Sequence, residues 1–171
     1  MKTFFNFCPS CGSSDIIFPN QVRLSCNDCG FVYFHNIAAA VAVVFTFEGQ
    51  VLFTVRNQEP DKGKLDLPGG FIDPEENAEQ AACREIREEM GLEIAPDRLK
   101  YITTQPNNYL YKDVLYRTMD IFFECPLQNQ DLSVAAPDEI KALIWKNPKQ
   151  MDFNEIGFVS IRKVIENFYG K

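Results

Sequence analysis

Hydrophobic and polar positions divide the central part of the chain into two strands and a long loop. Residues 38–47 are small, β-branched or aromatic, which is typical of a buried strand. Glu48-Gly49 is a turn signal, and the apolar pattern resumes over residues 51–56, so the two segments predict a β-hairpin. Residues 57–69 are polar and contain two prolines and two glycines, so we expect a loop there.

A strong helical pattern follows over residues 77–90. Asn77 is a plausible N-cap, with Gln80 three positions later as a weak capping box, and Gly91 ends the pattern. Asp73, before Pro74, is a rival start. The beginning of this helix therefore has two candidates.

The remaining apolar segments complete a sheet flanked by helices. Residues 99–104, 118–124 and 142–146 are strand candidates. Near the C-terminus, apolar residues at helical spacing predict an amphipathic helix packed on the sheet: Phe158, Ile161, Ile165 and Phe168. The mixture indicates an α/β fold.

Length and composition indicate one ordinary domain with a small attachment. The chain has 171 residues, of which 46% are hydrophobic, and its composition changes near residue 36. We therefore divide it into residues 1–35 and residues 36–171. The formal net charge of −7 disfavours non-specific nucleic-acid binding, because an acidic protein repels phosphate. A cation would be needed to handle a polyphosphate.

The sequence predicts a cytosolic protein that does not cross a membrane. Its most apolar stretch, residues 37–47, is too short to cross a bilayer, and the first residues do not resemble a secretory signal. In such a protein the six cysteines are better explained as thiols or metal ligands than as disulfides.

Four cysteines form two C-x-x-C pairs near the N-terminus: Cys8, Cys11, Cys26 and Cys29. Two residues between thiolates let both sulfurs of a turn reach one ion, so two such pairs predict a closed tetrahedral Zn²⁺ site. Residues 16–24, between the pairs, would form a hairpin. A unit of about thirty residues has too small a core to fold alone, and zinc would supply the difference. A redox dithiol or a site that has lost its metal are the alternatives.

Three glutamates crowd one side of the 77–90 helix. At about 100° per residue, Glu85, Glu88 and Glu89 fall close together and border the apolar face. Like charges in this position repel one another, and Mg²⁺ or Mn²⁺ would relieve the repulsion because these ions prefer oxygen ligands. Arg84 can orient a carboxylate without binding metal. An exposed acidic helix with ordinary ion pairs is the alternative.

At these residues the sequence resembles the Nudix hydrolases. The pattern Gly70-x5-Glu76-x7-Arg84-Glu85-Ile86-x-Glu88-Glu89-x-Gly91-Leu92 fills every fixed position of their signature. The resemblance covers roughly residues 37–171. It implies an α/β/α sandwich with a mixed sheet, preceded here by the small zinc ribbon. It also implies hydrolysis of a nucleoside diphosphate linked to another group.

The resemblance implies roles for individual residues. The ligands of Mg²⁺ or Mn²⁺ would be Glu85, Glu88, Glu89 and the carbonyl of Gly70. Glu76 would brace the motif, and Arg84 would orient Glu85. Glu139 is the candidate for a further ligand or base from a later loop, so the general base is either Glu85 or Glu139.

A zinc ribbon before such a domain is similar to the NADH diphosphatases. Their Ser-Gln-Pro-Trp-Pro-Phe-Pro-x-Ser segment corresponds here to residues 104–112, which keep Gln105-Pro106 but lack the Trp-Pro-Phe-Pro element. NADH, NAD⁺, ADP-ribose and sugar nucleotides are therefore all candidate substrates. Arg56 could contact a phosphate, and Tyr109, Tyr111 or Tyr116 could stack on a base. The alternatives are an exposed arginine and ordinary aromatics of a loop or sheet.

The resemblance leaves two further expectations. Relatives with a ribbon are often dimers, which implies a possible homodimer. A nucleotide-sensing regulatory protein without turnover is the alternative to an enzyme.

Overall fold

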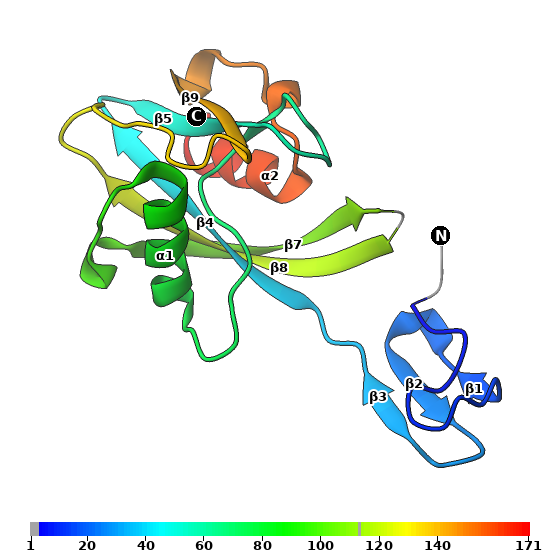
Figure 1. Cartoon of the computed structure of the whole chain (residues 1–171). Helices are drawn as coiled ribbons and strands as arrows, with labels where there is room; N and C mark the ends of the chain where they lie inside the picture. The colour runs from blue at the N-terminus through cyan, green and yellow to red at the C-terminus, as the bar shows by residue number, and fades with distance from the viewer. Residues whose placement is uncertain (1–3, 113) are drawn as a thin grey trace.

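The computed structural model describes residues 4–112 and 114–171, which contain two separate β-sheets (Figure 1). The first is a three-stranded antiparallel sheet in the order β1-β2-β3, formed by β1 (Ile16–Ile17), β2 (Arg23–Cys26) and β3 (Val32–Phe34). Strands β1 and β2 form the hairpin expected between the cysteine pairs. Strand β3, which follows the second pair, was not expected.

The second sheet has six strands in the order β6-β5-β4-β8-β7, and β9 pairs with β5. Its strands are β4 (Ala38–Phe47), β5 (Gln50–Arg56), β6 (Leu65–Asp66), β7 (Lys100–Tyr111), β8 (Val114–Pro126) and β9 (Ile140–Lys146). Strands β4 and β8 run parallel, whereas the other pairs are antiparallel, so the sheet is mixed. The predicted β4–β5 hairpin is confirmed.

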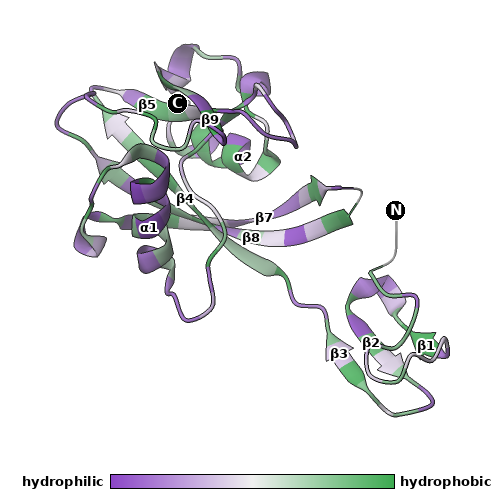
Figure 2. Cartoon of the chain, in the orientation of Figure 1, coloured by the Kyte–Doolittle hydropathy of each residue, from purple (hydrophilic) through white to green (hydrophobic). Residues whose placement is uncertain are grey.

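Alternation along β4 places a hydrophobic core on each face of this sheet. Val41 and Val43 pack with the helix α1 (Ala78–Met90), whereas Ala42 and Val44 pack with the helix α2 (Val159–Phe168). The α/β/α arrangement is confirmed. Hydrophobic residues concentrate in the strands, and the long connections are mostly hydrophilic (Figure 2).

Some elements differ from the sequence prediction. Strands β7 and β8 are longer than expected and pair over almost their full length, with Pro106 opposite Met119. Proline is tolerated there because β7 is an edge strand. Strand β6 interrupts the predicted 57–69 loop by pairing with β5. Phe168, expected on the packing face of α2, is 54% exposed because it follows the last buried turn of that helix.

The described residues also form four 3-10 helices: Pro19–Gln21, Pro96–Arg98, Pro148–Gln150 and Phe153–Glu155. Among the described residues, no helix combines the length and apolar character needed to span a bilayer.

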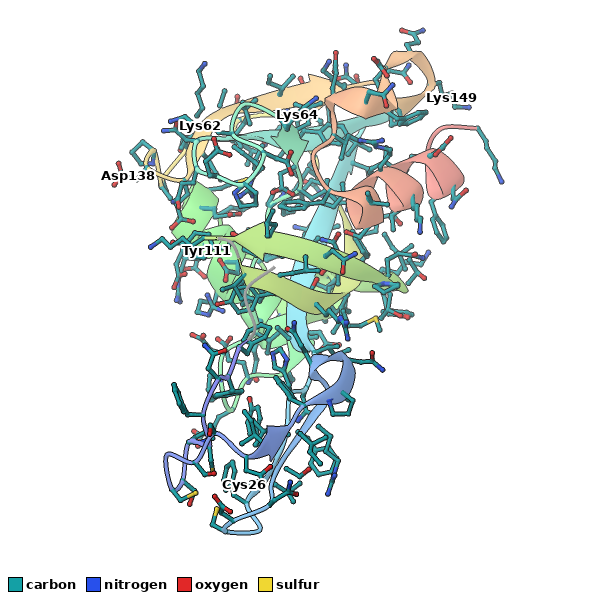
Figure 3. All side chains as sticks on the ribbon, turned by 90° about the vertical axis from the view of Figure 1, so that its right-hand side faces the viewer. Cys26, Lys62, Lys64, Tyr111, Asp138 and Lys149 are labelled. Atoms are coloured by element: carbon teal, nitrogen blue, oxygen red, sulfur yellow. The ribbon has the colours of Figure 1, made fainter. Side chains whose placement is uncertain are left out.

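The N-terminal unit projects from the larger sheet and has almost no core of its own (Figures 1 and 3). Within residues 4–35, the only buried hydrophobic residues are Leu24 and the two cysteines Cys8 and Cys26. Aromatic contacts connect this unit to β8, since the ring of Phe4 lies 4.1 Å from that of His35 and 5.9 Å from that of Tyr116. The division at residue 36 remains a prediction.

Candidate active site

Local sequence fixes the ends of α1, which carries the glutamates. Asn77 is the N-cap: its side chain accepts from the backbone N–H of Gln80, and the side chain of Gln80 accepts from that of Asn77. Gly91 ends the helix in the left-handed conformation, at φ 65°. Asn77 rather than Asp73 is therefore the start, and the register of the glutamates on α1 is set by these two caps.

A glycine-containing loop runs beside β4 and faces α1. The backbone N–H groups of Val43 and Val41 donate to the carbonyls of Pro68 and Gly70, at 2.9 and 2.8 Å. Gly69 has φ 144°, and a Cβ there would lie 2.1 Å from the carbonyl oxygen of Val41. Glycine is therefore required for this close approach.

The same loop touches two of the three glutamates. The N–H of Gly69 donates to Oε2 of Glu89 at 3.0 Å. A Cβ on Gly70 would lie only 2.4 Å from Oε1 of Glu85. The Glu85 carboxylate therefore occupies the space that a side chain at residue 70 would fill. The Gly70 carbonyl already accepts one hydrogen bond and has one lone pair left for a metal ion.

Arg84 organises the remaining carboxylates. Its Nε and Nη2 bind both oxygens of Glu76, at 2.8 and 3.0 Å. Its Nη1 donates to Glu85 at 2.8 Å and to Glu88 at 3.2 Å, and Nη2 also reaches the carbonyl of Phe71. The hydrogen bonds that Arg84 donates to Glu76 raise the pKa of Arg84, which therefore stays charged while it holds Glu85 in place.

The glutamates are partly buried acids. Glu89 is 8% exposed, and burial raises its pKa well above the usual range, with the charges of Asp66, Glu85 and Glu139 adding to the effect. Burial also raises the pKa of Glu85, although the hydrogen bond from Arg84 opposes it. Buried carboxylates in excess of nearby cations are a suitable donor set for Mg²⁺ or Mn²⁺, which prefer hard oxygen ligands.

These carboxylates are less tightly gathered than the cysteines. Among the described residues, the four cysteines are the one set of three or more candidate ligands whose ligand atoms all lie within 4.8 Å of one another. In the glutamate set, Arg84 holds Glu85 and Glu88, while Glu89 faces Gly69. That the three glutamates share metal ions therefore remains a prediction.

Glu139 reaches the same site on a separate segment, which backbone hydrogen bonds attach to α1 and to the segment after β5. The N–H of Ala135 donates to the backbone carbonyl of Glu89 at 2.8 Å, and the N–H of Asn57 donates to the carbonyl of Glu139 at 2.7 Å. The Asn57 side chain also donates to the carbonyl of Pro137. Glu139 lines the same cavity as Glu85 and Glu89, and its charge adds to the rise in their pKa that burial causes.

One cavity of about 450 Å³ is lined by Glu85, Glu88, Glu89 and Glu139, together with Arg56 and Tyr109. Arg56 is already engaged: it donates to Asp66 at 2.6 Å and to the carbonyl of Pro60 at 2.7 Å, and its guanidinium lies 4.9 Å from the centre of the Phe158 ring.

The three tyrosines proposed to stack on a base lie in different surroundings. Tyr109 lines the cavity, and its ring lies 5.8 Å from the rings of both Phe71 and Phe158. Tyr111 stacks on Tyr109 but does not line the cavity, and Tyr116 contacts Phe4 of the N-terminal unit. Tyr109 is therefore the tyrosine placed to meet a substrate.

Two buried acids of the cavity were not identified from the sequence. Asp66 and Asp120 both line the cavity and are 9% and 8% exposed. The sequence did contain an indication of both, because each is an acidic residue between two apolar residues. Their meeting depends on the sheet order, in which β6 and β8 lie on either side of β5 and β4.

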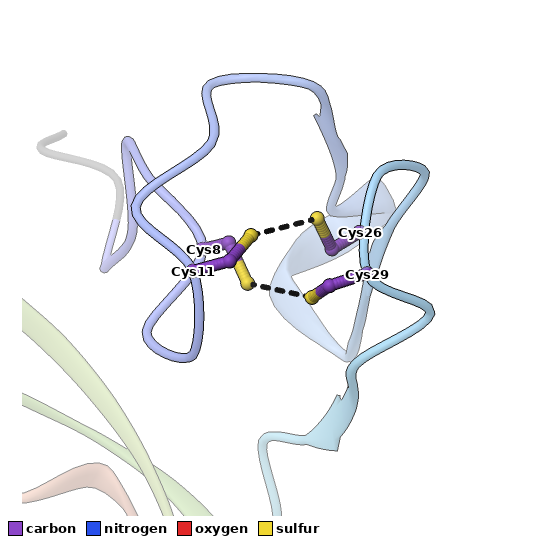
Figure 4. Close-up of side chains that lie close together, drawn as sticks. All are labelled: Cys8, Cys11, Cys26 and Cys29. Carbon is purple, nitrogen blue, oxygen red and sulfur yellow. Dashed lines mark hydrogen bonds between the residues drawn. The ribbon is translucent and has the colours of Figure 1, made fainter.

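The cysteine cluster lies at the far end of the molecule from Lys62 and Asp138, which belong to loops next to the cavity (Figure 3). The Sγ atoms of Cys8 and Cys29 are 3.7 Å apart, as are those of Cys11 and Cys26 (Figure 4). A tetrahedral ion with bonds of about 2.3 Å requires sulfur separations of about 3.8 Å. The four free thiols fit a Zn²⁺ ion closely.

Curated relatives match more than half of the chain. The chain is 27% identical over 106 residues to the NAD-capped RNA hydrolase NudC of Vibrio atlanticus. This alignment covers 62% of the chain and 38% of that protein. It is 31% identical over 99 residues to NudC of Stutzerimonas stutzeri, covering 58% of this chain and 35% of that protein. The chain thus spans less than half the length of these relatives.

Solved structures share the fold. A NUDIX hydrolase from Nitrosomonas europaea superposes with a TM-score of 0.66 at 22% identity, covering 98% of this chain and 94% of that one. The NUDIX domain of Shewanella oneidensis NrtR, solved with ADP ribose, has a TM-score of 0.60 at 22% identity and covers 78% of this chain and 86% of that one. The profile of the NUDIX domain matches residues 35–168. The chain therefore belongs to the Nudix family.

Proposed function

We propose that this protein is a hydrolase that cleaves the diphosphate of a nucleoside diphosphate linked to a second group, with Mg²⁺ or Mn²⁺ as cofactor. Candidate substrates are NAD⁺, NADH, ADP-ribose and sugar nucleotides. Family membership and the NAD-capped RNA hydrolases among the relatives support this class of substrate.

One observation carries the proposal: Glu85, Glu88, Glu89 and Glu139 line a single cavity, although they come from a helix and a separate loop. In an exposed acidic helix, Glu89 would lie in solvent and Glu85 would not depend on a glycine beside it. Here Glu89 is buried, and the Glu85 carboxylate fits only because residue 70 has no side chain. Both features are expected where carboxylates must hold cations beside a substrate.

The side chains divide the chemical work. Glu85, Glu88, Glu89 and the Gly70 carbonyl would hold the ion, which when bound would neutralise the diphosphate and acidify a water molecule. Arg84 orients Glu85 and is itself held by Glu76. Either Glu85 or Glu139 would accept the proton of the attacking water, since both carboxylates face the cavity.

A substrate panel tests the function. The full chain would be incubated with NAD⁺, NADH, ADP-ribose, nucleoside triphosphates and sugar nucleotides, with and without Mg²⁺ or Mn²⁺, and the products would be identified. We expect cleavage of at least one diphosphate that depends on the metal. Absence of any metal-dependent cleavage would contradict the proposal.

Nucleotide binding without turnover is the second candidate function. It is favoured by one observation, that a structurally similar NUDIX domain was solved with ADP ribose bound. Calorimetry with ADP-ribose would separate the two functions, because a sensor binds the nucleotide and leaves it intact, whereas an enzyme converts it.

We further propose that residues 1–35 form a zinc ribbon separate from the Nudix domain of residues 36–171. The sulfur separations and the nearly absent core of the small unit support this. Six free thiols support a reducing compartment such as the cytosol. The homodimer implied by the resemblance remains a prediction that sedimentation would test.

A further inference from the structure

One end of the β7–β8 hairpin extends beyond the rest of the larger sheet. Strand β8 pairs with β4 from Thr118 onward, whereas it pairs with β7 from Val114 onward. Among the described residues, positions 114–117 therefore pair with β7 alone. We call residues 108–112 and 114–117 the hairpin arm, which projects to one side of the sheet (Figure 1). Two strands without a third neighbour are only marginally stable, so the arm depends on side-chain contacts.

The hairpin arm carries the tyrosine that lines the active-site cavity. The ring of Tyr109 lies 5.8 Å from the rings of Phe71 and Phe158, and all three residues line that cavity. Phe71 directly follows Gly70, whose missing side chain makes room for the Glu85 carboxylate. A displacement of the arm would therefore move Tyr109 away from the wall of the cavity beside the glutamates.

The residue opposite Tyr109 contacts the N-terminal unit. Tyr116 pairs with Tyr109 across the two strands, and directly opposed side chains of antiparallel strands lie on the same face. The ring of Tyr116 meets that of Phe4 edge to face, with the centroids 5.9 Å apart. Among the aromatic pairs of the described residues, this is the one that joins residues 4–35 to the larger sheet.

The ring of Phe4 is itself supported by the N-terminal unit. It packs against the ring of His35, with the centroids 4.1 Å apart. The backbone N–H of His35 donates to the carbonyl of Val22 at 2.7 Å, and its Nδ1 lies 3.1 Å from the carbonyl oxygen of Gln21. Phe4 therefore connects Tyr116 of the arm to a histidine that hydrogen bonds hold on the small unit.

The packing around this contact is open. A second cavity, of about 620 Å³, lies between the N-terminal unit and the arm, and Leu115, Arg117, Phe4 and His35 are among its lining residues. An open interface has fewer neighbouring atoms than a close-packed one, so each ring contact contributes a larger share of its attraction. Loss of the Phe4 ring should therefore release the arm.

We propose that Phe4 and Tyr116 are positioning residues: through their contact, the N-terminal unit holds the hairpin arm so that Tyr109 lies against the bound substrate. The effect on substrate rests on the proposed hydrolase function, whereas the effect on the arm does not. Tyr109 supplies no ligand to the proposed metal site. Loss of the contact should therefore weaken substrate binding and leave the chemical step unchanged.

Hydrogen exchange without any nucleotide tests the effect on the arm. In the zinc-loaded full chain, Phe4→Ala should speed amide exchange in the hairpin arm about fivefold, the scale of one lost aromatic pair, and leave α1 and α2 unchanged. Phe7→Ala is the matched control, because Phe7 belongs to the same unit and is 61% exposed. Unchanged exchange in the arm, or an equal effect of Phe7→Ala, would overturn the inference.

Steady-state rates test the effect on substrate. With the nucleotide that the panel shows to be cleaved fastest, Phe4→Ala and Tyr116→Ala should each raise KM about fivefold and leave kcat nearly unchanged. The double variant should be no worse than either single variant, because both remove the same contact. Tyr116→Phe keeps the ring and should keep the wild-type KM. A fall in kcat at unchanged KM, or a KM for Tyr116→Phe as high as for Tyr116→Ala, would contradict the positioning role.

The two measurements separate this inference from the hydrolase proposal. If no nucleotide in the panel is cleaved, the hydrolase proposal fails, and faster exchange in the arm of Phe4→Ala still supports the contact. If a nucleotide is cleaved but neither KM nor exchange responds to Phe4→Ala, the positioning role fails and the hydrolase proposal stands. If Tyr116→Ala does not fold, Phe4→Ala decides.

Discussion

The two candidate metal sites differ in how completely the chain forms them. The cysteine sulfurs already lie at the separations of a tetrahedral zinc site, whereas the glutamates are distributed between Arg84 and Gly69. The cysteine unit has almost no core, and the glutamates stand on a helix packed into a large one. A structural ion substitutes for missing hydrophobic burial, whereas a catalytic ion is added to a scaffold that is stable without it.

Removal of zinc should give the largest difference between the two regions. Structural zinc sites bind with about 10–16 kcal/mol, which exceeds what the one buried leucine of the small unit could replace. Cys26→Ser, or a strong chelator, should therefore abolish amide protection in residues 4–34 and leave it in α1 and α2. Hydrogen exchange followed by mass spectrometry would measure this. Loss of protection in both regions at once would contradict the separation.

Glu89→Gln should remove activity without removing the fold. We expect kcat to fall about 10²–10³-fold, the usual scale for one electrostatic group in an active site. The amide keeps the size of the side chain and relieves a buried charge, so the melting temperature should not fall. Calorimetry would measure the melting temperature, and initial rates would measure kcat. Glu79→Gln on the first turn of α1 is the matched control, and an equal loss of activity there would contradict the assignment.

Gly70→Ala should change the position of the Glu85 carboxylate, and therefore kcat, without unfolding the protein. The new Cβ would lie 2.4 Å from the Glu85 carboxylate, which can turn aside, so the fold should survive while kcat falls about 10²-fold, as for a misplacement near 1 Å. Gly49→Ala is the control. Its φ of 75° imposes backbone strain, but nothing lies within 4 Å of the added carbon, so it should lower the melting temperature and not kcat. The reverse pattern would contradict this use of Gly70.

Arg84→Lys should have a smaller effect. Lysine keeps the charge but cannot bind both oxygens of Glu76 while it holds Glu85, so activity should fall about 10-fold or somewhat more. Steady-state rates over a range of Mg²⁺ concentrations would show the cause. A higher Mg²⁺ requirement is expected, and an unchanged requirement would contradict an orienting role.

The pH dependence of stability should give the smallest effect. In protein that keeps zinc but is free of Mg²⁺ and Mn²⁺, burial raises the pKa of Glu89, Glu85 and Asp66, so at these groups the folded state binds more protons than the unfolded state above pH about 4.3. Stability should therefore decrease as pH rises from about 5 to 8. Urea unfolding across this range would measure the slope. Glu89→Gln should make it shallower, and a stability that increases with pH would contradict the predicted direction.

Local signals predicted most of the elements that form the site, and non-local pairing explains the rest. Asn77, Gln80 and Gly91 fix α1 through contacts within a few residues, so its end could be predicted and its start narrowed to two candidates, of which the structure has Asn77. Strand β7 extends through Pro106 because β8 pairs with it, which no local pattern indicates. The spacing of the glutamates predicted their shared face on α1.

The floor of the cavity could not be predicted in the same way. The meeting of Asp66 and Asp120 in one cavity depends on two strands, β6 and β8, that are far apart in the chain and do not pair with each other. Arg56, expected to be available for a phosphate, is paired with Asp66 because the short strand β6 returns antiparallel beside β5. Charged residues within apolar strands indicate that a partner exists, but only the sheet order determines which residue it is.

The two-sided attachment at Glu89 has a consequence for how this site can diversify. Its carboxylate meets the glycine loop, while its backbone carbonyl receives Ala135 and so anchors the segment that leads to Glu139. The stretch between β8 and Ala135 is thus clamped downstream by main-chain atoms that no side-chain replacement removes. Lengthening that stretch costs little loop entropy. Related chains could therefore vary this connection by insertion and keep Glu139 in place.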